Sequence, residues 1–207
     1  MSGKNSDPCE LFGEIDIYLF DQILKGRFHS GSRILDAGCG YGRNLRYFLK
    51  NGFDVFGIDA SAAAIEQLRL SARELSTSAD AQHFRVEDLE KISFSDATFD
   101  AVLCNAVLHF ARDEAHFERM ILELWRVLKD GGLLFTRLAS TIGIESRVQP
   151  LQGRWFHLPD GSDRYLVDEA ILMNWTRRIG VELLEPVKTV NVQGMRCMTT
   201  WVIRKKS

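Results

Sequence analysis

The residues most able to do chemistry follow short apolar runs, and the first such cluster is an aspartate with three glycines. Residues 34–35 are apolar, and Asp36, Gly38, Gly40 and Gly42 follow them. An apolar run that ends in turn-forming residues predicts a buried strand followed by a tight turn. Glycine allows positive φ and lets a ligand approach the backbone, because it has no β-carbon. The pattern therefore predicts a ligand-binding turn at the end of a strand.

The carboxylate of Asp36 indicates the charge of that ligand. Dinucleotide-binding turns have the spacing Gly-x-Gly-x-x-Gly, because a pyrophosphate must lie against the backbone. This chain instead has Gly38-x-Gly40-x-Gly42. A carboxylate at the strand end repels a pyrophosphate but attracts a cation, such as the amino group and sulfonium of S-adenosylmethionine. The turn therefore favours a cationic ligand.

Three further polar residues each follow a strand-like run. Asp59 follows residues 53–58, Asp88 follows residues 81–87, and Asn105 follows residues 99–104. A carboxylate at the end of the second strand of such a sheet is placed to bind a ribose diol. A solvated aspartate at a helix start is the alternative for Asp59. Glu87 competes with Asp88 one residue earlier, and both side chains could be loop charges.

The run from Arg33 to Asn44 resembles the first motif of class I S-adenosylmethionine-dependent methyltransferases, and the later polar residues extend the resemblance over residues 34–135. The resemblance implies an enzyme that transfers a methyl group from S-adenosylmethionine to a small-molecule acceptor by in-line displacement and leaves S-adenosylhomocysteine. Asp36, Gly38 and Gly40 would hold the methionine part. Asp59 would hold the ribose, and Asp88 the adenine amino group. The full set of expected cofactor contacts is Asp36, Gly38, Cys39, Gly40, Asn44, Asp59, Ala60, Asp88, Leu89 and Asn105.

The same resemblance implies an α/β, Rossmann-like fold over residues 1–207 as a single domain. We expect a seven-stranded, mostly parallel sheet with the last strand antiparallel and helices on both faces. Apolar spacing predicts helices over residues 11–28, from Asp113 onward, and from Asp168 to Gly180. Gln193 and Gly194 separate two β-rich runs, which predicts an antiparallel hairpin at the end of the chain.

Residues for the acceptor are expected on two segments beside the sheet. Residues 1–30 would form a helical lid, in which Tyr18 either faces the methyl donor or packs in the core. The loose, aromatic segment 141–167 follows the fifth strand, where relatives carry substrate-recognition insertions. In it, Trp155, His157 and Tyr165 line the acceptor pocket or, alternatively, anchor a surface loop to the core. Arg137, at the end of the fifth strand, is a further acceptor residue.

His109 is the candidate catalytic residue of the chain. Its ordinary pKa near 6.5 would let the imidazole act as a general base at neutral pH. An oxygen or amine acceptor that loses a proton would need such a base, whereas a thiolate would not. Packing around the cofactor is the alternative role for this side chain.

Composition narrows the functional class further. The 207 residues have a net charge of −2 and are 45% hydrophobic, with four cysteines and no CxxC pair. The net charge does not indicate binding to nucleic acid. The sequence has no apolar run long enough for a bilayer, and its cysteines do not have the spacing of a metal site. The polar first residues lack the apolar centre of a signal peptide. We expect a cytoplasmic monomer or homodimer with reduced thiols and no metal.

Two alternatives stay open on the sequence. A non-catalytic S-adenosylmethionine sensor or partner subunit would keep the acidic and glycine residues but lose the acceptor pocket. A nicotinamide-dependent oxidoreductase would also use Asp59 for a ribose, but Asp36 and the glycine spacing speak against it.

Overall fold

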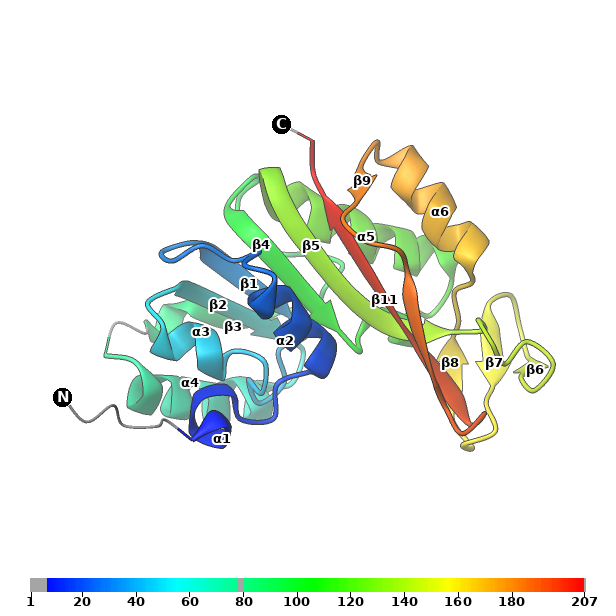
Figure 1. The fold of residues 1–207 in the computed structure, drawn as a ribbon, viewed down its shortest axis with the longest axis horizontal. Coiled ribbons are helices and arrows are strands. Elements are labelled where there is room, and N and C mark those ends of the chain that lie inside the picture. Colours follow the sequence, from blue (N-terminus) through cyan, green and yellow to red (C-terminus); the bar gives the residue numbers. More distant parts are fainter. Residues whose placement is uncertain (1–6, 78–79, 207) are drawn as a thin grey trace.

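A sheet of parallel strands, reversed at one edge, runs through the middle of the molecule (Figure 1). The computed structural model describes residues 7–77 and 80–206. Five strands run parallel in the order β3-β2-β1-β4-β5. Their bounds are β1 Arg33–Ala37, β2 Asp54–Asp59, β3 Phe84–Val86, β4 Phe99–Asn105 and β5 Leu128–Ser140. Parallel strands place all their carboxyl ends at the same edge of the sheet, where ligands bind in such folds.

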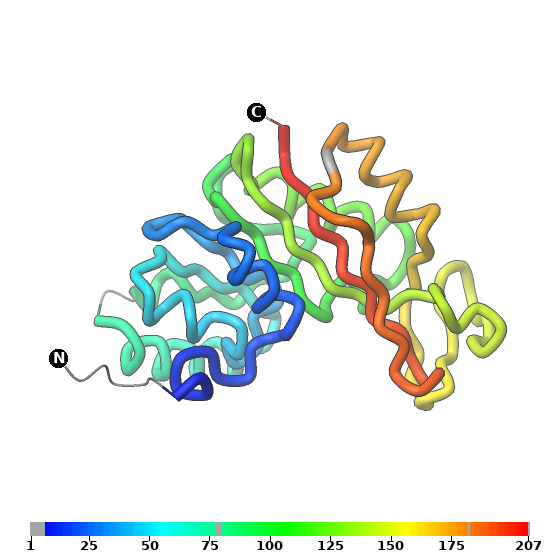
Figure 2. The backbone as a smooth tube through the Cα atoms, viewed as in Figure 1, coloured from blue at the N-terminus to red at the C-terminus, as the bar shows by residue number. Residues whose placement is uncertain are grey.

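The reversed edge is the predicted hairpin at the end of the chain. Strand β11 (Arg196–Arg204) pairs antiparallel with β5 and with β10 (Lys188–Val192). The chain runs from one strand to the other through Gln193 and Gly194, which both have positive φ. In Figure 2 the hairpin runs beside β5. The expected seven-stranded sheet is confirmed, and the two-residue β9 (Glu182–Leu183) adds a short eighth strand paired with β11.

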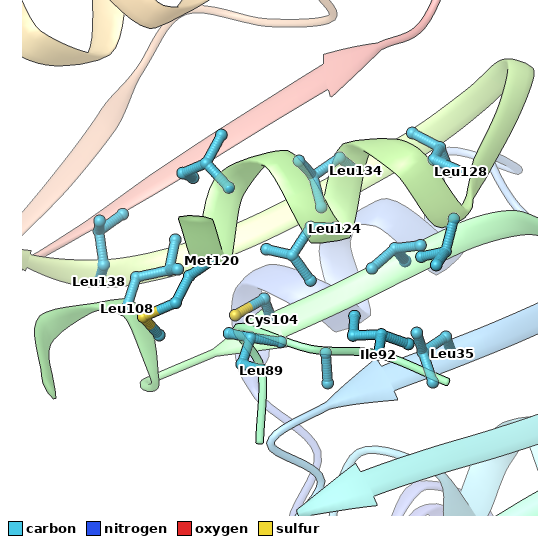
Figure 3. Close-up of a cluster of buried hydrophobic side chains, with 14 of the residues drawn as sticks. Leu35, Leu89, Ile92, Cys104, Leu108, Met120, Leu124, Leu128, Leu134 and Leu138 are labelled. Atoms are coloured by element: carbon cyan, nitrogen blue, oxygen red, sulfur yellow. The ribbon is translucent and has the colours of Figure 1, made fainter. Parts of the chain in front are cut away.

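Helices cover both faces of the sheet and divide the core into two large clusters. On one face, α5 (Glu114–Val127) and α6 (Glu169–Arg178) pack against the sheet, and Figure 3 shows Leu124 of α5 near Leu134 of β5. On the other face, Leu19, Phe48 and Ile65 come from α2 (Ile17–Leu24), α3 (Arg46–Lys50) and α4 (Ala62–Leu75). None of the helices in the described part of the chain is long and apolar enough to cross a membrane.

Side-chain caps explain where several helices begin. Ser61, Asp113 and Asp168 each accept a hydrogen bond from the backbone N–H three residues later. Such a bond satisfies one of the free N–H groups of the first turn. The predicted helix starts at Asp113 and Asp168 are therefore confirmed. Two short 3₁₀ helices, η1 (Ala81–His83) and η2 (Leu108–Phe110), lie beside the strand ends.

The N-terminal segment differs from the single helix expected over residues 11–28. It forms α1 (Pro8–Phe12) and α2, which are separated by Gly13 with a φ of 60°. This conformation ends the first helix, and Asp16 then caps the second by accepting a hydrogen bond from Tyr18 N–H (2.9 Å). Residues 1–6 of the expected lid lie outside the described part of the chain.

The segment after β5 forms its own small sheet. Its strands β6 (Gln149–Pro150), β7 (Trp155–His157) and β8 (Asp163–Tyr165) pair antiparallel in the order β6-β7-β8. Figure 1 shows this sheet beyond the end of β5, next to the β10–β11 hairpin. Val167 then returns to the main sheet through a parallel bridge to Ser140. Segment 141–167 therefore lies at the edge of the sheet where ligands bind.

We predict that Gly38→Ala destabilises the fold more than Gly40→Ala. Both glycines have positive φ, which costs an alanine about 1–2 kcal/mol. A β-carbon on Gly38 would also lie 2.2 Å from Cγ2 of Val107, whereas none of the described atoms lies within 4 Å of one on Gly40. The overlap adds about 1–3 kcal/mol. Urea unfolding of both variants measures the difference, and equal losses would contradict it.

Candidate active site

A cavity of about 370 Å³ lies at the carboxyl ends of β1, β2 and β4. Six of the residues expected at the cofactor line it: Gly38, Asp59, Ala60, Asp88, Leu89 and Asn105. They come from four separate stretches of the sequence, and the parallel sheet brings them together. We call this space the first cavity.

Asp36 lies on β1, two residues before Gly38 of the first cavity, and is one of two buried side chains near this cavity without a partner among the described residues. Its side chain is 1% exposed, and neither carboxyl oxygen has a hydrogen-bond partner among the described residues. Burial raises the pKa of this carboxyl to about 7, while the positive charge of Arg43 opposes the shift and Asp59 adds to it. A buried polar group without a partner is costly, so this carboxyl is suited to a partner from outside the chain.

Asn105 shows the same lack of partners at the end of β4. Its side chain is buried, and neither the amide oxygen nor the amide nitrogen has a partner in residues 7–77 or 80–206. The side chain lines the first cavity. Asp36 and Asn105 therefore offer a carboxyl, an acceptor and a donor to a polar ligand at two neighbouring strands.

Asp59 is held in place by the backbone on both sides of it. One carboxylate oxygen accepts the N–H of Gly40 and the other accepts the N–H of Ser61, each at 2.8 Å. Each oxygen can accept two hydrogen bonds, so the carboxylate retains capacity for a ligand in the first cavity. The glycine turn thus orients the residue expected at a ribose.

The two competing carboxylates after β3, those of Glu87 and Asp88, differ in their hydrogen-bond partners. Glu87 accepts hydrogen bonds from the backbone N–H and the hydroxyl of Ser93. The carboxylate of Asp88 forms no hydrogen bond or ion pair with the part of the chain that the structure describes, although Asp88 lines the first cavity. Asp88 is therefore the freer of the two for a ligand.

Besides Asp36, three residues expected at the cofactor do not line the first cavity: Cys39, Gly40 and Asn44. The thiol of Cys39 is buried beneath Gly57 of β2, and burial raises its pKa above the ordinary value. The amide oxygen of Asn44 accepts the N–H of Asp16 (3.1 Å). The backbone N–H of Gly40 donates a hydrogen bond to the carboxylate of Asp59. In this structure these three residues contact the scaffold, and their contact with the cofactor stays a prediction.

A second cavity of about 540 Å³ adjoins the first, and Ala106 lines both. Ala106 has a φ of 63°, and its N–H donates to the carbonyl oxygen of Arg137 (2.7 Å). A non-glycine residue in this region carries backbone strain, which is common at functional sites. The charged and titratable residues that line the second cavity are Arg43, His109, Arg137, Asp160, Arg164 and Arg196.

His109 lines the second cavity, and its surroundings make the imidazole a weak base. Burial and the nearby charges of Arg164 and Arg196 lower its pKa to about 4, so the imidazole is neutral at pH 7. Nδ1 accepts the N–H of Ala139 (3.3 Å). A neutral imidazole that accepts at Nδ1 carries its proton on Nε2. In this tautomer the free ring nitrogen is a donor.

Arg137 lines the second cavity as expected, but its charge is already paired. Its guanidinium donates to Asp16 (2.8 Å), which is itself buried, and lies over the ring of Tyr18 at 5.1 Å. Tyr18 does not line the cavity. This ion pair fastens the start of α2 to the end of β5.

The three aromatic residues of segment 141–167 do not line the second cavity, and their expected role at the acceptor stays a prediction. Tyr165 is buried and stacks on Phe117 of α5. The indole of Trp155 donates to the carbonyl oxygen of Arg112 (2.9 Å), and His157 pairs with Asp163 on the exposed small sheet. Tyr165 and Trp155 have the alternative role, in which they anchor the segment.

Sequence reasoning missed the arginines of the second cavity. Arg43 stands in the glycine turn, Arg164 on β8 and Arg196 at the start of β11. It also missed Phe110 of η2, Arg112 after it, and His116 and Met120 of α5, which line the first cavity. The arginines could have been noticed only by their charge, and Phe110 and Met120 have no such signal. No cluster of three metal-ligating side chains occurs among the described residues.

Comparisons with known proteins agree with this geometry. The family model described as a methyltransferase domain matches residues 35–136. A ubiquinone biosynthesis O-methyltransferase of Xylella fastidiosa (strain 9a5c) is 30% identical over 187 residues, covering 85% of this chain and 69% of the relative. A malonyl-[acyl-carrier protein] O-methyltransferase of Enterobacter lignolyticus is 34% identical over 110 residues, or 53% of this chain. The chain spans only 40% of that second relative.

Solved structures share the fold. A methyltransferase from Methanosarcina mazei superposes with a TM-score of 0.73 at 23% identity, over 89% of this chain and 97% of the other. A Burkholderia thailandensis 1,6-didemethyltoxoflavin-N1-methyltransferase, solved with S-adenosylhomocysteine, has a TM-score of 0.71 at 17% identity. The match covers 95% of this chain and 80% of the other chain.

We predict that Asp36 makes the stability of the ligand-free protein fall as the pH rises from about 4 to about 7. The folded-state pKa of about 7 lies above the value near 4 of an unfolded aspartate, so the folded protein binds the extra proton in this window. The contribution is complete below pH 4 and is lost by up to about 1.4 kcal/mol per pH unit. Urea unfolding across this range, beside Asp36→Asn, measures it. Parallel pH curves for the two proteins would contradict the prediction.

Proposed function

The chain belongs to the class I S-adenosylmethionine-dependent methyltransferases, and from that membership we propose that it methylates a small-molecule acceptor by in-line displacement. One observation carries the proposal. Asn105 and Asp36 are buried and have no side-chain partner among the described residues; Asn105 lines the first cavity, Asp36 lies two residues before Gly38 of its lining, and a second cavity opens next to the first at Ala106. This arrangement suits a methyl donor and an acceptor that meet at a shared wall.

The residues of the first cavity fit the donor. S-adenosylmethionine, when bound, supplies a methyl carbon made electrophilic by the adjacent sulfonium. Asp36, in its ionised form, and Asn105 would hold the charged methionine part, since neither has a partner within the described chain. Asp59 would accept the ribose hydroxyls, and Asp88 the adenine amino group, beside Leu89. The roles of Asp36 and Asn105 would give partners to two buried side chains that have none among the described residues.

The second cavity would orient the acceptor. Holding two reactants in the correct geometry supplies several kcal/mol of rate enhancement without covalent catalysis. We propose segment 141–167 as the acceptor-recognition part of a single domain, because Leu158, Asp160, Ser162 and Arg164 reach the cavity from it. We propose α2 as part of a lid, since the pair of Asp16 with Arg137 joins it to the cavity wall.

The second cavity also favours catalysis over a non-catalytic sensor. A protein that only senses the cofactor needs no acceptor site beside it. Here a strained residue, Ala106, separates the two spaces, and both cavities lie at the carboxyl end of the sheet. Strain is retained where it has a function.

We predict that Asp59→Ala weakens the binding of S-adenosylhomocysteine by about 1.4 kcal/mol or more, which is a tenfold loss. The substitution removes the carboxylate that faces the first cavity and frees the glycine turn from its hydrogen bond. Asp54→Ala at the other end of β2 is the matched control, because Asp54 pairs with Arg33 away from the cavity. Calorimetric titration gives the affinities.

Equal losses in both variants would contradict the assigned position of the cofactor. Failure of the folded, unmodified protein to bind S-adenosylhomocysteine would overturn the proposed function itself.

A further inference from the structure

The second cavity has a strong excess of positive charge in its lining. Four arginines line it, Arg43, Arg137, Arg164 and Arg196, and the lining contains a single carboxylate, that of Asp160. The whole chain is slightly acidic, with a net charge of −2. The excess is therefore local and belongs to this site.

Two of these arginines are already compensated by carboxylates. Arg137 is paired with the buried Asp16 at 2.8 Å. Arg196 lies 3.7 Å from Asp160, but its side chain is 56% exposed, so the pair is long and solvated. Exposed pairs of this kind contribute little to stability. Arg196 can therefore turn to a ligand at small cost.

The other two have no carboxylate partner. Arg164 donates to the backbone oxygen of Asp163 (2.7 Å) and lies over the ring of Phe110 at 5.0 Å. Arg43 has no hydrogen bond or ion pair to any described residue. Phe110 lines the first cavity, so Arg164 stands near the wall between the two cavities. Free guanidinium groups in one cavity bind carboxylate or phosphate oxygens well, because their N–H groups match the geometry.

His109 adds a neutral donor to these cations. Its Nδ1 is occupied by the N–H of Ala139, and its Nε2 forms no hydrogen bond to the part of the chain that the structure describes. The cavity lining thus contains cationic and neutral donors, and its one carboxylate faces Arg196.

We propose that the methyl acceptor is an anionic small molecule whose acidic group is bound by Arg43, Arg164 and Arg196 in the second cavity. The proposal rests on the proposed function, since it names the class of acceptor for that reaction. The shared chemistry is an oxyanion, either a carboxylate or a phosphate. Such a group neutralises the unpaired arginines, and it brings the acceptor beside Ala106.

The test measures anion binding to the protein saturated with S-adenosylhomocysteine. Binding is detected as a rise in the melting temperature of the protein at constant ionic strength. The probes are succinate and inorganic phosphate, with succinamide as the uncharged control. We expect one of the anions to bind, and Arg164→Gln and Arg196→Gln each to weaken it about tenfold. The preferred anion distinguishes a carboxylate from a phosphate acceptor.

Two further variants complete the design. Arg177→Gln, on the exposed face of α6, is the matched control and keeps the anion affinity of the unmodified protein. Arg164→Lys keeps the charge and retains part of the affinity. We expect Arg164→Gln and Arg196→Gln to keep their affinity for S-adenosylhomocysteine, which would show that both variants are folded.

The proposal is overturned if neither anion binds, if succinamide binds equally well, or if Arg164→Gln and Arg196→Gln leave the affinity unchanged. In each case intact binding of S-adenosylhomocysteine leaves the proposed function standing. Loss of that binding in the unmodified protein is instead the failure of the proposed function.

Discussion

A buried carboxyl group without a partner in the described chain is the constraint on which the site depends. Asp36 lies on the central strand β1, and Leu35 and Ala37 beside it are fully buried. Transferring an ionised carboxylate into such surroundings is so unfavourable that the group takes up a proton instead, which is the reason its pKa rises to about 7. A ligand with a positive charge reverses this balance. The binding free energy of the ligand and the instability of the empty site thus have the same origin.

The parallel sheet places further polar side chains close to this carboxyl group. Strands β1, β2 and β4 end at the same edge, so Asp36, Asp59 and Asn105 lie together although nearly 70 residues separate the first from the last. Asp59 in turn fixes the glycine turn through Gly40. The positions of these side chains, their charges and the backbone conformation of the glycine turn therefore depend on one another. A substitution at one of these residues affects the others.

The reversed edge of the sheet builds the second cavity. Because β11 runs antiparallel to β5, its first residue, Arg196, lies at the ligand-binding edge, next to the end of β5. A parallel last strand would have placed that residue at the opposite edge. The same geometry brings segment 141–167 and its Arg164 across the opening. The charge of the cavity is thus a consequence of topology.

The sequence alone determined the features that depend on local order along the chain. Alternation of apolar runs and turns predicted the strands, Asp36 with its glycines predicted the ligand, and Asp113 and Asp168 predicted helix starts. Only the tertiary structure decided which side chains face the cavities. Tyr165 and Trp155 anchor segment 141–167, while Arg43, Arg164 and Arg196 meet in space from three distant segments. The physical reason is that strand and helix signals are local, whereas the facing of a loop side chain is set by packing against residues far away in the sequence.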